Sequence, residues 1–152
     1  MTLPPAVLWI DPGKATGLAL YIRHMRQFTV REEAFISAGN LIESVCRAWG
    51  PQLWVGWEQF TIFPGTPAAD AHHAIEMIGV SRRLAMQNRC LILPAAAPSD
   101  RNVATMRLLK ELGWWVPNRD DAQSAAQHCL SWMMRSGNLP DDVAVRLAAL
   151  RD

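Results

Sequence analysis

Apolar and polar positions divide the chain into a strand-rich opening third and a remainder with helical periodicity. Residues 6–10 are continuously apolar and are followed by Asp-Pro-Gly, which is the pattern of a buried strand stopped by a turn. The next two apolar stretches are joined across a short polar segment, so we interpret the opening as an antiparallel meander. Strands are expected over residues 6–10, 17–22, 27–36, 53–57 and 90–93.

Helical spacing begins after the third expected strand. Apolar residues between positions 41 and 49 recur on one helix face, and a Gly-Pro pair closes that helix. The next helix carries apolar residues on two faces, so one face can pack on the sheet while the other meets a second subunit. Gly113 stands where the helix before it would end. These further helices are expected over residues 69–87, 99–112, 120–134 and 140–152.

The composition is that of an ordinary globular protein. Apolar residues make up 50% of the 152 residues and charged residues 19%, so one domain over residues 1–152 is expected. A chain of this length can bury about 70% of the surface that it exposes when unfolded. Because the formal net charge is only +1, any positive surface for nucleic acid must be local.

The cysteines and the N-terminus both indicate a reducing compartment. Cys46, Cys90 and Cys129 are widely spaced within apolar runs, which favours reduced core thiols over a disulfide or a zinc site. The N-terminus lacks the pattern of a signal peptide, and no apolar run approaches the ~20 residues that span a bilayer. We therefore expect a cytoplasmic protein that does not enter a membrane.

Three acidic residues stand where secondary structure changes. Asp11 and Glu58 follow apolar strands, and Asp121, next to Asp120, opens a helix. Burying a carboxylate beside apolar strands is costly unless a cation or hydrogen bonds compensate, so three such positions suggest a shared cation. Each acid taken alone is equally well explained as a cap of its turn or helix.

The ligand types favour a hard cation. A set made of carboxylates without histidine or cysteine at metal spacing is typical of magnesium or manganese sites. Two such ions about 3.5 to 4 Å apart would hold the attacking and leaving oxygens of a phosphodiester during in-line displacement. Hydrolysis of a phosphodiester is therefore the reaction that these residues favour.

The acids lie within a longer pattern that resembles the RuvC-type Holliday-junction resolvases of the RNase H-like superfamily. The sequence Ile-Asp-Pro-Gly over residues 10–13, with Thr16 and Gly17, resembles their first strand and turn. Glu-Gln-Phe over residues 58–60 resembles their second acidic strand end, and residues 74–94 resemble their dimer helix and following strand. Asp121 with a small-residue helix resembles their last acidic motif, so the resemblance extends over residues 7–134.

The resemblance implies an RNase H-like α/β fold, a mixed five-stranded sheet flanked by helices. It also implies a homodimer through the helix around residues 71–87 and magnesium-dependent paired nicks in a four-way DNA junction. Asp11, Glu58 and Asp121 would be catalytic and would hold the metal together with Asp120; manganese is expected to substitute for magnesium. The family places a fourth acid where this chain has Ser124, which leaves weaker metal binding or a binding-only protein open. The short segment before residue 117 resembles compact bacteriophage members, in which case the location is the host cytoplasm.

Several cations and one aromatic residue are candidates for DNA contact. Phe63, beside a Pro-Gly turn, could wedge against a base step, whereas Phe60 is expected in the core. Solvated surface charge is the alternative explanation for each cation. Expected phosphate contacts are Lys14, Arg101, Arg107, Lys110 and Arg119.

Other polar and aromatic residues are expected to be structural. Trp114 and Trp115 are interpreted as covering a core edge. His128 lies two helical turns after Asp121 on the same face, so it is either a core histidine or an aid to proton transfer.

Three other classes of protein are alternatives to a junction resolvase. The turn after the first strand also resembles the phosphate loop of actin-like ATPases, but those need two such domains and a far longer chain. A YqgF-type RNA nuclease has a similar fold and opening motif and stays open. A dimer that recognises branched DNA by shape without cutting it also stays open.

Overall fold

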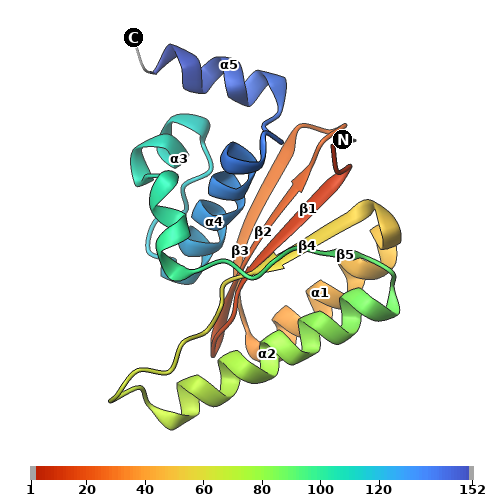
Figure 1. The fold of residues 1–152 in the computed structure, drawn as a ribbon, viewed down its shortest axis with the longest axis vertical. Coiled ribbons are helices and arrows are strands. Elements are labelled where there is room, and N and C mark those ends of the chain that lie inside the picture. Colours follow the sequence, from red (N-terminus) through yellow and green to blue (C-terminus); the bar gives the residue numbers. More distant parts are fainter. Residues whose placement is uncertain (1–2, 151–152) are drawn as a thin grey trace.

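The computed structural model describes residues 3–150, which form a mixed sheet between two layers of helices (Figure 1). The strand order is β3-β2-β1-β4-β5. β1 pairs antiparallel with β2 and parallel with β4, and β5 continues the parallel side. The strands are β1 (Ala6–Asp11), β2 (Ala15–Ile22), β3 (Gln27–Ala34), β4 (Leu53–Trp57) and β5 (Leu91–Ile92).

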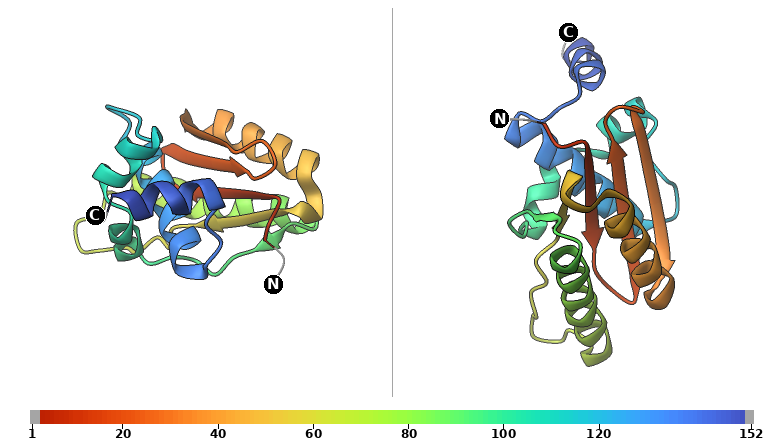
Figure 2. Two further views of the ribbon diagram at one scale, coloured as in Figure 1. Left: turned by 90° about the horizontal axis from the view of Figure 1, so that it is seen from above. Right: turned by 90° about the vertical axis from the view of Figure 1, so that its right-hand side faces the viewer.

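The helical layers lie on opposite faces of the sheet, as Figures 1 and 2 show. One layer contains α1 (Phe35–Trp49) and α2 (Ala68–Gln87). The other contains the 3-10 helix η2 (Pro98–Val103), α3 (Met106–Leu112), α4 (Asp120–Ser136) and α5 (Asp141–Ala149). The expected α/β class, with a mixed five-stranded sheet flanked by helices, is therefore confirmed.

The central strand explains why its sequence is apolar without alternation. β1 has helices on both faces, so successive side chains enter two different cores. Trp9 packs with α4, whereas Leu8 and Ile10 pack with α1 and α2. All three side chains are almost completely buried. Because β1 and β4 run parallel, their carboxyl ends reach the same edge of the sheet.

Two expected element boundaries are wrong. The third strand ends at Ala34, and residues 35–36 already belong to α1. The single helix expected over residues 99–112 is broken at Ala104, whose N–H donates to Ser131 Oγ (3.0 Å) and whose carbonyl accepts from Gln127 Nε2 (3.0 Å). These bonds to α4 hold Ala104 in an extended conformation, so a new helix begins after Thr105.

The remaining helices follow the sequence more closely. Gly113 ends α3 in the left-handed conformation (φ 74°), as expected. The last helix ends at Ala149, and residues 151–152 of the expected tail lie outside the described residues. Cys46, Cys90 and Cys129 are buried free thiols, also as expected. None of the helices within residues 3–150 combines the length and the apolar character that crossing a bilayer requires.

Candidate functional site

Asp11 and Glu58 are neighbours because their strands are neighbours. Ile10 pairs with Trp57, and the carbonyl of Ile10 accepts a hydrogen bond from the N–H of Glu58 (3.1 Å). Beyond this point Glu58 forms a bridge to Ala96, which continues the parallel pattern past β5. The two acids thus leave the sheet at the same edge, as their positions after apolar runs predicted.

Asp121 reaches this edge of the sheet from the first turn of α4. Gly17 in β2 pairs with Asp11, and a Cβ atom built on Gly17 would lie 1.8 Å from the carbonyl oxygen of Asp121. The backbone of α4 therefore rests directly on the backbone of β2. Only glycine permits this approach, which brings Asp121 beside Asp11.

Glu32 in β3 holds the start of α4 and was not identified from the sequence. Its Oε2 atom accepts hydrogen bonds from the N–H groups of Asp121 (3.1 Å) and Ala122 (3.4 Å). The local N-cap position, Arg119, supplies no side-chain cap, and its guanidinium lies 3.7 Å from Glu32. A carboxylate from a distant strand thus satisfies the helix terminus, where a negative charge is favourable.

Burial and neighbouring carboxylates raise the pKa of both Asp11 and Asp121. Burial, the charge of Glu58 and, to a smaller extent, the charge of Asp121 raise the pKa of Asp11 to about 7. A hydrogen bond from Ser124 and the charge of Arg101 oppose this shift. Burial, Glu32 and Asp120 raise the pKa of Asp121, with Glu58 contributing least. Negative charge therefore outweighs the single positive charge of Arg101 in the cluster, which is the electrostatic condition that favours a bound cation.

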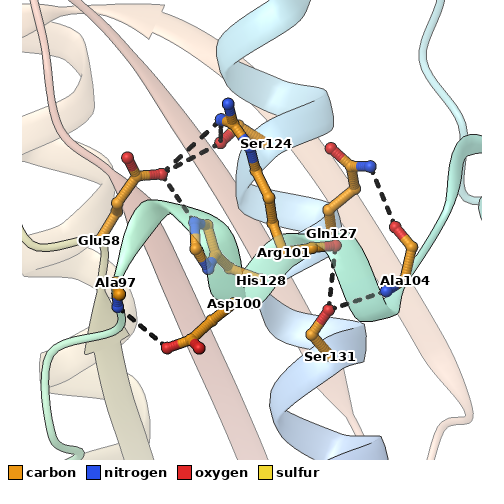
Figure 3. A network of polar contacts seen from close by, with 9 residues as sticks. All are labelled: Glu58, Ala97, Asp100, Arg101, Ala104, Ser124, Gln127, His128 and Ser131. Atoms are coloured by element: carbon orange, nitrogen blue, oxygen red, sulfur yellow. Dashed lines mark hydrogen bonds and ion pairs between the residues drawn. The ribbon is translucent and has the colours of Figure 1, made fainter.

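Glu58 is the centre of a polar network that Figure 3 shows from close by. Its Oε2 atom accepts from His128 Nε2 (2.7 Å) and from Ser124 Oγ (3.4 Å). Arg101 Nη1 donates to Ser124 Oγ (2.9 Å) and lies 3.9 Å from Glu58 Oε2. Asp121, Ser124 and His128 come from successive turns of α4, so one helix face supplies three groups to the site.

His128 belongs both to the core and to this network. Its side chain is 1% exposed, and its ring stacks on Trp9 with a centroid separation of 6.0 Å. Because a carboxylate can only accept, Nε2 carries the hydrogen that Glu58 binds. Within residues 3–150, the buried Nδ1 atom has no hydrogen-bond partner, and the residue is among those that line a cavity of about 340 Å³. His128 is thus a core histidine whose polar atom is bonded to Glu58, and a role for it in proton transfer stays a prediction.

The donor set fits a hard divalent cation in charge and chemistry. Carboxylate oxygens are the ligands that magnesium prefers, and a cation would relieve the repulsion that raises the pKa of Asp11. Within residues 3–150, however, no three His, Cys, Asp or Glu side chains already surround a common metal position. Glu58 instead contacts His128, Ser124 and Arg101. Metal ligation by the three acids thus stays a prediction.

The expected DNA-contacting residues are placed differently from one another. Arg101 enters the acidic cluster. Lys14 is exposed and lines a groove of about 310 Å³ together with Asp121 and the half-buried Phe60. Phe63 is 64% exposed on the segment between β4 and α2, which projects from the body of the molecule in Figures 1 and 2.

Three other candidate cations lie away from Asp11 and Glu58 or have other contacts. Arg119 pairs with Glu32, and Lys110 lies 5.6 Å from the ring centroid of Trp115. Arg107 is exposed on α3 and lines a separate pocket with Leu147 of α5. Asp120 is exposed and acts on the cluster through its charge alone, by raising the pKa of Asp121. A role for these residues in DNA or metal binding stays a prediction.

The two adjacent tryptophans cover a core edge, as expected. Trp114 and Trp115 are half-buried and pack against the core between the sheet and α4. The ring of Trp114 stacks on Phe28 of β3 with a centroid separation of 4.0 Å.

Comparisons with known proteins agree with this arrangement. No protein-family model matches the chain, and no curated protein sequence matches it either. Among solved structures, Thermus thermophilus RuvC in complex with a Holliday-junction substrate superposes with a TM-score of 0.65 at 16% identity, over 88% of this chain and 97% of that chain. RuvC of the same organism gives 0.51 at 16% identity, with the same coverage. The yeast mitochondrial Holliday-junction resolvase Ydc2 gives 0.51 at 12% identity, over 95% of this chain and 85% of that chain.

These identities are low, so the likeness concerns the fold. The strand order and the helices on both faces agree with it over nearly the whole described chain. The chain therefore has the RNase H-like α/β fold found in the RuvC-type Holliday-junction resolvases.

Proposed function

We propose that this protein is a structure-selective endonuclease that resolves four-way DNA junctions by metal-dependent hydrolysis of phosphodiesters. The observation that carries the proposal is geometric: Asp11 and Glu58 leave neighbouring parallel strands at one edge of the sheet, and the contact of α4 with Gly17 brings Asp121 to the same edge. Three carboxylates brought together with only the charge of Arg101 to offset them are costly, and a bound cation would make them favourable. The fold shared with junction resolvases supports the same proposal.

Asp11, Glu58 and Asp121 would hold magnesium, with manganese as a substitute. When bound, the ion would supply Lewis-acid stabilisation of charge on the scissile phosphate and a more acidic water nucleophile. Glu58 is oriented by His128, whose buried ring fixes one carboxylate oxygen. Lys14, in the groove beside Asp121, is placed to attract a phosphate toward the cluster.

The proposed enzyme acts as a homodimer through α2. Ile75 (54% exposed), Gly79 and Met86 (64% exposed) lie on one outward face of this helix. Exposed apolar side chains around a glycine allow close packing of a second copy, which would place two sites on one junction. Size-exclusion chromatography with light scattering tests this: the wild type should be a dimer and Met86→Glu a monomer. A monomeric wild type would contradict it.

A protein that binds branched DNA without cutting it is the second candidate. The absence of a ready-made metal site within residues 3–150 favours this alternative, as does Ser124 on the helix face that carries Asp121. Binding by shape and backbone contact needs no metal.

One assay separates these candidates and the RNA nuclease. Labelled four-way junction, linear duplex and structured RNA are incubated with the protein in magnesium, manganese or EDTA. Symmetric nicks in the junction that require the metal support the proposal, provided that Asp11→Asn, Glu58→Gln and Asp121→Asn lose cutting but still bind. Cleavage of RNA alone, or tight binding of the junction without any cutting, would reject it.

A further inference from the structure

Arg101 is a cation placed within the acidic cluster by the protein itself. Its Nη1 atom donates to Ser124 Oγ at 2.9 Å and lies 3.9 Å from Glu58 Oε2. Its charge also opposes the rise in the pKa of Asp11. A guanidinium at this distance from a carboxylate stabilises the charged form of the acids, as a metal ion would.

The position of Arg101 is fixed by the helix that carries Asp121 and Ser124. Its carbonyl accepts from Ser131 Oγ (3.2 Å), and Ser131 Oγ in turn accepts from the N–H of Ala104 (3.0 Å). At the start of the same 3-10 helix, Asp100 caps the N–H of Ala97 (2.9 Å). Figure 3 shows the hydrogen bonds of Arg101 and Ala104 to Ser131, which connect the η2 segment to α4. Arg101 is thus part of the scaffold of the site.

Charge balance limits how many metal ions this arrangement needs. When ionised, the three proposed ligands Asp11, Glu58 and Asp121 supply three negative charges, and Arg101 supplies one positive charge beside them. A single divalent ion neutralises the remainder of this set. A second divalent ion would have to lie close to the guanidinium, which would repel it.

The geometry points to Arg101 as a built-in cation that takes the place of a second divalent ion. The cluster then binds one metal ion, and the guanidinium stabilises charge on the scissile phosphate. This inference rests on the proposed metal-dependent nuclease and deepens it. The Arg101 side chain is 41% exposed, so donors not used by Ser124 remain open to a phosphate oxygen.

The inference makes metal binding and cutting respond in opposite directions. Replacing Arg101 removes a repulsive charge, so Arg101→Gln should bind manganese about tenfold or more tightly in the absence of DNA. Its junction cleavage at saturating manganese should fall about 100-fold, since a fixed donor to the phosphate is lost. If Arg101 were merely structural, its replacement would not strengthen metal binding.

Manganese binding to the DNA-free protein, by isothermal titration calorimetry with electron paramagnetic resonance of the free ion, is the test. The wild type should bind one ion per chain. Arg101→Lys, which keeps the charge, should bind like the wild type, and so should Arg47→Gln, which removes an arginine paired with Glu43 on α1. Thermal unfolding confirms that each variant is folded.

Each outcome has a separate meaning. Tighter binding by Arg101→Gln with weaker cutting supports the inference. Wild-type binding that Arg101→Gln leaves unchanged or weakens, or two ions per wild-type chain, overturns it while leaving the nuclease intact. Absence of manganese binding by both proteins overturns the inference and the metal-dependent function together.

Discussion

Gly17 lies so close to Asp121 that a Cβ atom on Gly17 would fall 1.8 Å from the Asp121 carbonyl oxygen. This backbone contact between β2 and α4 sets the separation of the acids, because Gly17 is also the strand partner of Asp11. The absence of a side chain at Gly17 is thus required both for the packing of α4 on β2 and for the position of Asp121 in the site.

Gly17→Ala should push α4 away from β2. We expect a loss of about 2 kcal/mol or more in the free energy of unfolding, because backbone atoms must move to admit the methyl group. Junction cleavage should fall at least about 100-fold as Asp121 leaves its position. Urea denaturation and single-turnover cleavage measure the two effects.

Gly39→Ala is the matched control for this change. Gly39 lies within α1, and a Cβ atom there would meet only Val80 Cγ1 at 4.0 Å. This variant should gain about 0.5 to 1 kcal/mol in stability from helix propensity and should cut normally. Equal effects of the two substitutions would contradict the importance of the Gly17 contact.

The raised pKa of Asp11 predicts an inverse dependence of stability on pH in the metal-free protein. The carboxyl ionises near 3.8 without the fold and near 7 within it. Between these values the folded state keeps a proton that the unfolded state has released, so stability falls as pH rises. The contribution is fully present below 3.8 and is lost as pH passes about 7.

Asp11→Asn should remove this dependence. In EDTA at about pH 8, the variant should be more stable than the wild type, although it cannot cut DNA. Magnesium should raise the melting temperature of the wild type but not that of the variant. Thermal unfolding at about pH 5 and about pH 8 measures both effects. If the wild type is the more stable protein in EDTA at the higher pH, the raised pKa of Asp11 would be contradicted.

Glu32 should act as a positioning residue for Asp121. Glu32→Ala removes the acceptor for two N–H groups at the start of α4, which should cost about 1 to 2 kcal/mol. Glu32→Gln keeps an acceptor oxygen and should lose less. Cleavage should weaken through a higher magnesium requirement, measured as the metal concentration that gives half-maximal cutting.

Glu33→Ala tests whether any acid in β3 has this effect. Glu33 Oε1 lies 3.8 Å from Nη1 of the exposed Arg31, and within residues 3–150 its side chain makes no hydrogen bond to α4. An exposed ion pair contributes little, so its loss should change stability by less than about 1 kcal/mol. If Glu33→Ala raised the magnesium requirement as much as Glu32→Ala, the capping explanation would be wrong.

Phe63 should contact the opened centre of the junction. Its ring is 64% exposed on the projecting segment, and Thr66 Oγ1 accepts the N–H of Phe63 (3.0 Å) to form a local turn. Phe63→Ala should reduce the fluorescence increase of 2-aminopurine at the crossover while leaving the folded protein unchanged. Ile62→Ala, at the neighbouring position, is the control. An identical fluorescence response from all three proteins would contradict the insertion of Phe63 at a base step.

The positions of Asp11 and Glu58 could be predicted because both depend on local patterns. A continuously apolar strand followed by a turn places the next residue at the sheet edge, and two parallel strands bring two such residues together. The two helices after residue 113 could be predicted for a similar reason, because helical periodicity is a local property of the sequence.

Contacts made by Glu32 and Arg101 could not be predicted in this way. Glu32 caps the N–H of Asp121, which lies 89 residues later in the chain, and nothing in the strand sequence distinguishes it from Glu33. Arg101 was expected to meet phosphate from the surface, but tertiary bonds to α4 turn it into the cluster. The break at Ala104 has the same origin, because its hydrogen-bond partners belong to α4.

The central claim is that Asp11, Glu58 and Asp121 hold a divalent cation. Crystals soaked with manganese, measured at a wavelength where manganese scatters anomalously, test it most directly. The predicted result is an anomalous peak contacting oxygens of all three carboxylates, with Glu58 turned from its contact with Arg101. Manganese bound elsewhere, or an empty cluster at saturating manganese, would contradict the claim.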